Sequence, residues 1–535
     1  MLRQTLRAEG ARGGPPGQSA QRLDEPGPFR GPASGALILV CVLLVFAFLI
    51  RLDGITTPSV ESRELHNALI ARQLFYGDGA GLPAWKQNVL QELGEVVTPI
   101  EPPVLDLIAA AGFRLAGGEE LWIPRLVSSA LWILGGVFLY LIAGRLMTRP
   151  VAVVAVGLYV FWPYGAFISR LYMPDAMMVT LLLAGALAVI RYWERPSFGR
   201  LLAAGGVSGA ATVAKPGVAI LFLLALFVAL ALSRRALTTA VRQGRLPLFI
   251  VLAALPTALY YVYGTFLRDF LSGQAGGRVD PALVATESFW RGWWEMVSIV
   301  LAYPQRQPIL ALIALAAGLA GVLVAREGLP RATLVGFGVG YVAFAFTFTF
   351  HVPSHAYYSL PLIPILALSI GTLAGFLIER LERGRTVRVT VVTFLALAVG
   401  VAAYKAHAVV TPPAPTETIA EYEQIGKLTR HTTRAVYVDL RLRSPISYWG
   451  WVVGRYWYPP TPSQDLPLSG DPFPPWIHPE DVSFFIIDLS ELSTEPRLGT
   501  FTRDLPLVGR TSHHAILDAR GARAVEADRR PQTDR

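Results

Sequence analysis

Long uncharged stretches recur along this chain, and they constrain its fold more than any other feature of the sequence. An apolar run of roughly 17–25 residues is long enough to cross the hydrocarbon core of a bilayer as a helix. With 53% hydrophobic and 16% charged residues, the chain is also too apolar for an average soluble protein. We therefore expect an α-helical polytopic membrane protein with about eleven transmembrane helices. The predicted spans cover residues 34–51, 122–144, 150–168, 174–192, 198–214, 216–233, 246–264, 307–325, 331–350, 358–378 and 388–406.

The net charge of +9 comes from short arginine clusters between the apolar runs and not from one basic face, so nucleic acid is not an expected partner. If the runs alternate across the membrane, five of these clusters lie on the same side as the N-terminus. Lys and Arg are enriched in cytoplasmic loops. We therefore predict a multi-pass protein of the cell inner (plasma) membrane, with a cytoplasmic N-terminus and an external or periplasmic C-terminal part.

The rest of the chain divides into tails, one long loop and a soluble C-terminal part. Segments such as AVYVDL and VSFFIIDLS follow a Pro/Thr-rich linker, which predicts a small external α/β domain. Polar ends poor in apolar residues predict disordered tails. The predicted parts are a cytoplasmic tail at 1–33, a transmembrane domain at 34–406 with an external loop at 52–121, a linker at 407–418, an α/β domain at 419–520 and a tail at 521–535.

The external loop contains VESRELHNALIAR, residues 60–72, a charged segment that soon follows a membrane span. Thr57-Pro58 is a typical N-cap with proline at the first helical position. Apolar residues then recur at helical spacing. The residues that lie off this apolar stripe are Glu61, Glu64 and Arg72. We predict a helix lying on the membrane surface, and a second such helix at 104–116.

Candidates for chemistry are expected at the external ends of the spans, because an ionisable side chain at the centre of a membrane helix costs roughly 2.5–3.5 kcal/mol. The candidates are Glu61, Arg63, Glu64, His66, Arg72, Glu101, Asp106, Arg170, Asp175, Lys215, His355, Tyr357 and Tyr358. Glu61 and Glu64 lie one helical turn apart and can share a proton or hold a divalent metal ion. The alternative for this pair is a solvated helix face.

Several other candidates also have an ordinary alternative. Arg170 can fork two hydrogen bonds to a phosphate, and Asp175 can cap the following helix or pair with Arg170. Lys215 can snorkel to the membrane interface without any function. Tyr357 and Tyr358 fit the aromatic belt of a membrane protein. A common site is favoured because these residues recur in order on one side of the membrane.

Six segments between about residues 38 and 378 together resemble one known family. They are PSVESRELHNALIAR, EPPVLDLIAA, GGEELWIPRLVSSALWILGGVFLYLIAGRL, SRLYMPDAMMV, ATVAKPG and HAYYSLPLIP. In order, spacing and sidedness they resemble the GT-C glycosyltransferases, in the branch of protein O-mannosyltransferases and the aminoarabinose transferase of lipid A (glycosyltransferase family 39-like). The resemblance implies a GT-C-like fold for the transmembrane domain. It also implies transfer of a sugar from a polyprenyl-phosphate donor to an acceptor at the external face, with inversion at the anomeric carbon.

The resemblance implies roles for individual residues. It aligns Glu64 with the glutamate of the family's Asp-Glu motif and puts Arg63 where the aspartate usually stands. Glu101 stands beside Pro-Pro, where relatives often have lysine. Because polyprenyl phosphate is a stable anion, the reaction needs cations to hold it and one carboxylate to take a proton.

We predict Glu64 as this base, with Glu61 or Glu101 assisting it or binding a divalent ion. The predicted ligands of the donor phosphate are Arg63, Arg72, Arg170, Lys215 and Tyr358. Further site candidates are Asp175, His355 and Tyr357.

Two other function classes are consistent with the sequence. A transporter also has many spans, but its ionisable residues would lie near the membrane midplane, which they avoid here. An inactive relative that serves as a scaffold is the second alternative, because Arg63 stands in place of the usual aspartate. For the predicted transferase, the expected partners are the polyprenyl-phosphate-linked sugar, membrane lipids and an acceptor that is a lipid, a glycan or a protein.

Overall fold

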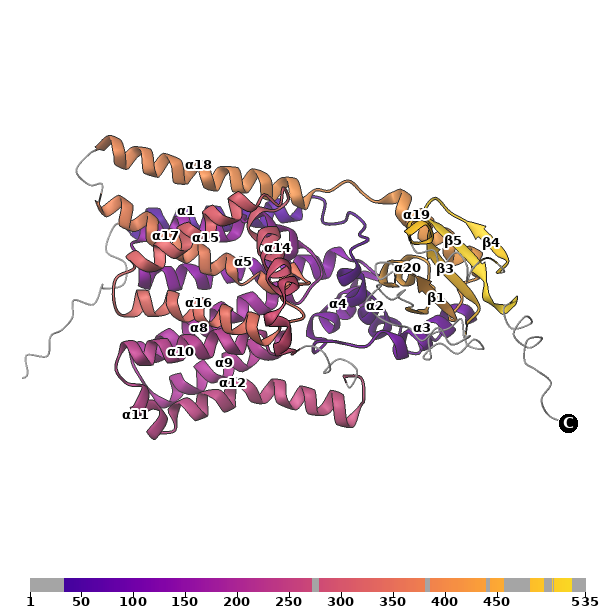
Figure 1. The fold of residues 1–535 in the computed structure, drawn as a ribbon, viewed down its shortest axis with the longest axis horizontal. Helices are drawn as coiled ribbons and strands as arrows, with labels where there is room; N and C mark the ends of the chain where they lie inside the picture. Colours follow the sequence, from indigo (N-terminus) through magenta and orange to yellow (C-terminus); the bar gives the residue numbers. More distant parts are fainter. Residues whose placement is uncertain are drawn as a thin grey trace, which may run out of the picture.

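The structure of the chain is a computed structural model that describes residues 33–271, 279–380, 385–438, 443–456, 482–494, 503 and 505–521. It consists of a bundle of long helices, a group of shorter helices at one end of the bundle, and a small sheet beyond them (Figure 1). The predicted tails, up to residue 32 and from residue 522, lie outside the described residues.

Every apolar run predicted from the sequence forms a helix of the bundle. These helices are α1 (Ala33–Leu52), α5 (Trp122–Leu146), α6 (Arg149–Phe161) with α7 (Pro163–Arg170), α8 (Asp175–Glu194), α9 (Phe198–Ala214), α10 (Val218–Ser233), α12 (Arg245–Val262), α15 (Pro308–Val324), α16 (Leu329–Thr347), α17 (Leu362–Arg380) and α18 (Arg385–Val410). Shorter connecting helices are α11 (Leu237–Arg242), η1 (Tyr263–Leu267), η2 (Pro281–Ala285), α14 (Glu287–Ala302) and η3 (Ala356–Ser359).

The number of helices that can cross a membrane is smaller than the sequence predicts. Within the described residues, seven are long and apolar enough, or eight when α6 and α7 count as one span bent by 54°. This bend falls at Pro163, which cannot continue the hydrogen bonding of α6. The predicted number of about eleven also includes α9, α10 and α15, which have 17, 16 and 17 residues and so fall just short of the 18 residues required for this smaller count.

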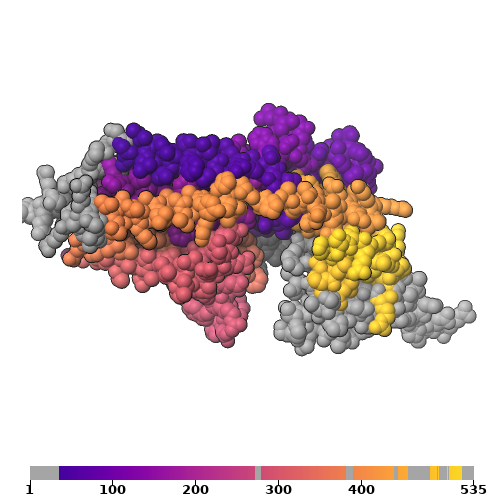
Figure 2. Space-filling view, turned by 90° about the horizontal axis from the view of Figure 1, so that it is seen from above, coloured from indigo at the N-terminus to yellow at the C-terminus, as the bar shows by residue number. Residues whose placement is uncertain are grey.

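α18 lies on the outside of the bundle and exposes apolar side chains. Figure 2 shows this helix in orange along the outside of the bundle, leading to the C-terminal part. Large apolar side chains on it are exposed, among them Phe394 and Leu397. A long helix with an exposed apolar surface is typical of contact with lipid.

Three helices fold together between the bundle and the sheet (Figure 1): α2 (Ser62–Tyr76), α3 (Ala84–Val96) and α4 (Val104–Ala116). Leu65 of α2 packs with Leu93 of α3 and Phe113 of α4 in one buried cluster. α4 has the predicted bounds, and it exposes Leu107 and Ile108, as a helix on a membrane surface would. The sequence did not predict α3.

Two expectations for α2 are wrong. The helix begins at Ser62, after the N-cap residue Glu61, and not at Thr57-Pro58. The reason is that Thr57 belongs to a turn after α1, in which its N–H donates to the Gly54 carbonyl. In addition, the alternative of a solvated face for Glu61 and Glu64 is wrong for Glu64, because other parts of the protein cover this side chain and leave it 0% exposed; Arg72 of the same helix is 3% exposed.

The C-terminal part contains a five-stranded sheet with the strand order β2-β1-β3-β5-β4. Its strands are β1 (Ala435–Val438), β2 (Gly454–Tyr456), β3 (Phe484–Asp488), β4 (Leu507–Arg510) and β5 (His514–Asp518), and its helices are α19 (Thr416–Leu428), α20 (Arg443–Trp449), α21 (Leu489–Thr494) and η5 (Ala519–Gly521). β1 is parallel to β2 and β3, whereas β5 is antiparallel to β3 and β4. Tyr437 and Ile486 of the sheet pack with Ile425 of α19 and Ile446 of α20. The predicted combination of a polytopic helical protein and a small α/β part is therefore confirmed.

Candidate active site

Five segments that are far apart in the sequence meet at the end of the bundle that faces the C-terminal part. They are the start of α2, the segment before α4, the turn between α7 and α8, the break between α9 and α10, and η3 with the residue before it. The side chains that they bring together, here called the cluster, are Glu61, Arg63, Glu101, Asp175, Lys215, His355, Tyr357 and Tyr358. All eight belong to the residues predicted from the sequence.

The break between α9 and α10 positions Lys215. A residue before proline avoids the helical conformation, and Lys215, which precedes Pro216, has an extended backbone with φ −142° and ψ 100°. Gly217 follows with a φ of 83°, a left-handed conformation that glycine adopts readily. A Cβ at Gly217 would lie 2.6 Å from the Phe348 ring. This turn therefore requires glycine, and it fixes Lys215 at the end of α9.

Lys215 is buried among polar and aromatic partners. Its Nζ lies 2.5 Å from Oδ1 of Asp175, and 4.3 and 4.5 Å from the ring centres of Tyr357 and Tyr358. Lys215 is 3% exposed, so it is not a lysine that snorkels to water. The two rings contact the ammonium group through cation–π interactions, and the tyrosines therefore do more than line a membrane interface.

Asp175 is fully buried at the first position of α8. Its carboxylate pairs with Lys215 and not with Arg170, and it does not cap the helix. Its second oxygen, Oδ2, has no hydrogen-bond partner among the described residues. A buried polar atom left without a partner costs about 1–3 kcal/mol, and each such exception requires an explanation, a catalytic role being one of several.

Arg63 and Glu101 form a second ion pair in the cluster. Burial alone would raise the pKa of Glu101, but the charges of Arg63 and Lys215 lower it overall. Burial, together with the same two positive charges, lowers the pKa of His355 to about 4, so this imidazole is neutral at physiological pH. The cluster therefore contains two cations, and each has one carboxylate partner.

Both carboxylate oxygens of Glu64, the predicted base, already accept hydrogen bonds. Its two oxygens accept hydrogen bonds from Nε and Nη2 of Arg125 at 2.7 and 2.9 Å, and Oε1 also accepts the Tyr172 backbone N–H at 3.0 Å. Burial would raise the pKa of Glu64, but Arg125 lowers it below the ordinary value. A buried carboxylate in this state is a poor proton acceptor. The geometry therefore favours a structural role for Glu64.

Glu61 is the exposed carboxylate at the edge of the cluster. Its side chain does not cap α2, and among the described residues it has no ion-pair partner. With Asp175 and Tyr357, it lies within electrostatic range of the Tyr164 hydroxyl. Partial burial and the charge of Glu64 raise the pKa of Glu61. Its exposure and the upward direction of this pKa shift are both consistent with a carboxylate that accepts a proton.

Glu61 and Glu64 do not fit a divalent metal ion as a pair. The lone pairs of Glu64 that would bind the metal already accept hydrogen bonds from Arg125 and Tyr172. Across the described parts of the chain, no three His, Cys, Asp or Glu side chains converge in a way that could hold a metal ion. The predicted metal site at this pair is therefore not supported by the arrangement of its donors.

Two predicted phosphate ligands lie away from the cluster. Arg170 donates through Nη2 to the carbonyl of Gly54, in the turn after α1. Arg72 lies at the opposite end of α2 from the cluster, where its Nε donates to Glu119 at 2.9 Å. Nη1 of Arg72 donates to the Tyr448 carbonyl at 2.9 Å, and this bond joins α2 to the C-terminal part.

A second bond joins the C-terminal part to the start of α2. Nε1 of Trp449 donates to the carbonyl of Ser59 at 2.9 Å. The Ser59 hydroxyl accepts the backbone N–H of Glu61 at 3.1 Å. Residues of α20 therefore hold the segment that carries Glu61.

Sequence reasoning missed two supports of this region, Arg125 and Tyr172. Nη1 of Arg125 donates to the carbonyls of Ile55 and Thr57 at 2.8 and 2.7 Å, so this arginine ties α5 to the segment before α2. The Tyr172 hydroxyl donates to Asp106, whose pKa burial raises to about 6. Arg125 and Tyr172 stand within two of the segments that carry the family resemblance, GGEELWIPRLVSSALWILGGVFLYLIAGRL and SRLYMPDAMMV, but nothing near them in the sequence marks their distant partners.

Part of the chain is similar to a known family. Residues 100–261 match the family described as dolichyl-phosphate-mannose-protein mannosyltransferase. This range includes Glu101, Asp175 and Lys215 of the cluster. No curated protein sequence matches the chain.

Solved structures share the fold over most of the chain. ArnT from Cupriavidus metallidurans in the apo state has a TM-score of 0.57 at 15% identity, covering 90% of this chain and 97% of ArnT. The same protein bound to undecaprenyl phosphate has a TM-score of 0.56 at 14% identity, covering 91% of this chain and 98% of ArnT. The oligosaccharyltransferase from Archaeoglobus fulgidus in the apo form has a TM-score of 0.53 at 11% identity, covering 87% of this chain and 71% of that one.

Proposed function

Because this chain has the fold of ArnT and its residues 100–261 match the dolichyl-phosphate-mannose-protein mannosyltransferase family, we propose that it is an active membrane glycosyltransferase. It transfers a hexose or pentose from a polyprenyl-phosphate donor to an acceptor, with inversion at the anomeric carbon. The reaction takes place at the end of the bundle that faces the C-terminal part, on the external side of the membrane. The family match favours this function over transport.

The observation that carries the proposal is the burial of Lys215 between a carboxylate and two tyrosine rings. An ammonium group has three N–H donors, and Asp175 accepts one of them at 2.5 Å. The other two can bind oxygens of the donor phosphate, and the hydroxyl of Tyr358 is a further donor. The ArnT structure with undecaprenyl phosphate supports a lipid of this class as the donor carrier.

Arg63 provides the second cation. A guanidinium group has five N–H donors, and the Nη2 group of Arg63 donates to Glu101. The remaining donors can hold a second phosphate oxygen in a forked geometry. Glu101 acts as a positioning residue, because it orients Arg63 without itself contacting the anion.

Glu61 is the general base of the proposed reaction. The acceptor hydroxyl attacks the anomeric carbon on the face opposite the phosphate, and the hydroxyl proton passes to the Glu61 carboxylate. The bond between the anomeric carbon and the phosphate oxygen breaks, and polyprenyl phosphate leaves with the electron pair. The charges of Lys215 and Arg63 stabilise the negative charge that develops on this leaving group.

Gene deletion followed by mass analysis of the cell envelope tests the function. We expect loss of one sugar from an envelope component and accumulation of a polyprenyl-phosphate sugar, both reversed by the wild-type gene. The component that loses the sugar identifies the acceptor as a lipid, a glycan or a protein. An unchanged glycan profile, with no accumulated donor, would contradict the proposal and favour an inactive scaffold.

A further inference from the structure

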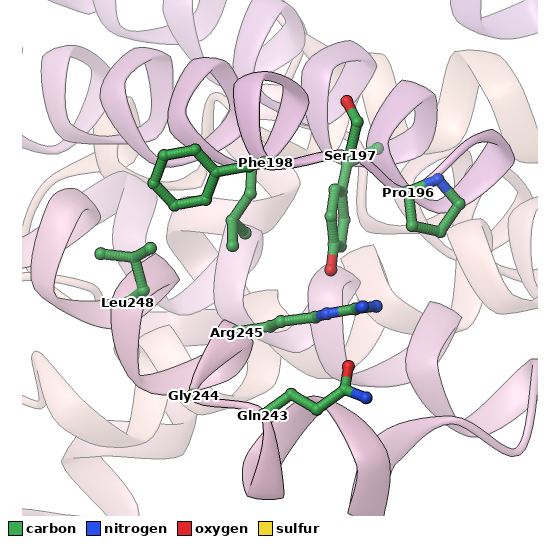
Figure 3. Close-up of a pocket in the computed structure, with 9 residues that line it drawn as sticks. Pro196, Ser197, Phe198, Gln243, Gly244, Arg245 and Leu248 are labelled. Atoms are coloured by element: carbon green, nitrogen blue, oxygen red, sulfur yellow. The ribbon is translucent and has the colours of Figure 1, made fainter.

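A cavity of about 270 Å³ lies at the end of the bundle opposite the cluster, between the ends of α8, α9 and α12. Asp175 begins α8 at the cluster, whereas Tyr192, near the other end of this helix, lines the cavity. Figure 3 shows Arg245 lying between Gln243 on one side and Ser197 and Pro196 on the other. The proposed transferase reaction uses none of these groups.

The polar side chains of this cavity have hydrogens to donate. Tyr192 is 1% exposed, and its hydroxyl has no hydrogen-bond partner among the described residues. Arg245 is half-buried and forms no ion pair with any residue that the structure describes. The Ser197 oxygen accepts the Arg200 backbone N–H at 3.3 Å, which leaves its own hydroxyl hydrogen for a ligand.

The start of α12 adds backbone donors. α12 has 18 residues and begins at Arg245, and no side chain caps its N-terminus. The N–H groups of Arg245 and Leu246 have no partner within the helix, whereas Pro247 has no N–H, and this end of the helix dipole favours negative charge. The N-cap residue is Gly244, where an added Cβ would meet no atom within 4 Å. The backbone is therefore open to a ligand here.

Negative charge is missing around the cavity. None of its nine lining residues, all in the described part of the chain, is acidic. Glu194, the acid that follows Tyr192 most closely in the sequence, is paired with Nε of Arg145 at 2.8 Å. A set of donors that includes an arginine, without an acid beside it, is suited to an anion with several oxygens, such as a phosphate.

We propose that this cavity binds the phosphate group of an anionic phospholipid from the surrounding bilayer. Apolar surface that leads away from the cavity supports a lipid over a free phosphate ion. Phe198 lines the cavity and is 68% exposed, and Leu202 and Val251 are exposed further along α9 and α12. Acyl chains can cover these side chains while the headgroup phosphate contacts Arg245. By the distribution of positive charges, this end lies in the cytoplasmic leaflet.

Lipid titration of the purified full-length protein tests the site. The probe is dihexanoyl-phosphatidylglycerol, a short-chain anionic lipid, and binding is measured by native mass spectrometry in a neutral detergent. We expect Arg245→Gln to weaken binding about tenfold or more, because it removes a charge-assisted hydrogen bond. Tyr192→Phe should weaken it about threefold or more through loss of one neutral hydrogen bond. Arg242→Gln is the matched control, since Arg242 is exposed and does not line the cavity.

Each alternative gives a different result. If Arg242→Gln weakens binding as much as Arg245→Gln, the lipid is held by diffuse charge and the proposal fails. Unchanged binding by Tyr192→Phe also contradicts the site. In that case Arg245 would bind the lipid at the membrane surface, without the buried hydroxyl of Tyr192. If inorganic phosphate binds as tightly as the lipid, the cavity is a free-phosphate site. Equal binding of dihexanoyl-phosphatidylcholine would refute the preference for an anionic lipid.

Discussion

Arg125 donates to both oxygens of Glu64, at 2.7 and 2.9 Å, and both side chains are buried. This pair joins α5 to α2, the helix whose first turn borders the cluster. The pair therefore holds the site in place, and Glu61 remains accessible beside it. A change at Glu64 should therefore lower mainly the stability of the protein, whereas a change at Glu61 should lower mainly its activity.

Glu64→Gln should destabilise the protein. It leaves the Arg125 charge buried without a partner, which typically costs about 3–5 kcal/mol of unfolding free energy. Chemical unfolding in detergent measures the change. The matched control is Glu61→Gln, whose exposed side chain should change stability by less than about 0.5 kcal/mol. A Glu64→Gln protein that is as stable as the wild type but inactive would restore Glu64 as the base.

Glu61→Gln should reduce the transferase rate by about 10²–10⁴-fold, the usual contribution of a general base. Because only the ionised carboxylate accepts a proton, wild-type activity should rise with pH as Glu61 loses its proton. The pKa of Glu61 is raised, so this rise should occur at a higher pH than for an ordinary exposed glutamate. A profile of kcat/KM against pH checks it. An acidic limb that persists in Glu61→Gln would assign the base to another residue.

Exchange of the Arg63–Glu101 pair separates its structural role from its role in donor binding. Arg63→Glu alone places two carboxylates together, and Glu101→Arg alone places two arginines together, so each should lower stability. The double exchange should recover the stability, with a coupling energy of about 0.5–3 kcal/mol in a double-mutant cycle. Donor affinity, measured with undecaprenyl phosphate, should not recover, because the cation has moved. Full recovery of donor binding would show that only the net charge matters.

Lys215→Met should abolish most donor binding and also destabilise the protein, because it leaves the Asp175 carboxylate buried and unpaired. Addition of Asp175→Asn removes the unpaired charge, so the double variant should regain stability. Donor affinity should stay at least about tenfold weaker than in the wild type. Undecaprenyl phosphate binding by the double variant distinguishes the two effects. Wild-type affinity there would remove Lys215 from the phosphate site.

Asp106→Asn should stabilise the protein at pH 7. Burial raises the pKa of Asp106 to about 6, so the folded protein favours the protonated carboxyl and loses this contribution as the pH rises through 6. Asparagine keeps an acceptor for the Tyr172 hydroxyl and carries no charge. The gain should be about 3 kcal/mol or less at pH 7 and should be nearly lost near pH 4. A gain that does not depend on pH would contradict this explanation.

The helices of the bundle could be predicted because their signal is local. An apolar run forms a membrane helix whatever its neighbours are, and the bounds of α4 agree with the predicted 104–116. The bounds of α9 also agree with the predicted 198–214, and α10 and α15 are each two residues shorter than predicted. The cluster residues could also be predicted, because sidedness places ionisable residues at one end of the bundle.

The partners of these residues could not be predicted, because they depend on contacts between distant segments. Glu64 and Arg125 are 61 residues apart, and Asp175 and Lys215 are 40 residues apart. The apolar stripe of α2 describes one face of the helix only. The face with Arg72 is covered by Tyr448, which lies 376 residues further along the chain. Periodicity along α2 therefore could not show that the fold buries this second face as well.

The bond from Trp449 to the Ser59 carbonyl has a consequence for biosynthesis. The segment between α1 and α2 is synthesised early, but α20, which contacts it through Trp449, is synthesised after the whole bundle. The bundle therefore inserts into the membrane while the loop that carries Glu61 still lacks this support. A chain that ends before α20 would therefore lack the bond that Trp449 donates to the segment before Glu61.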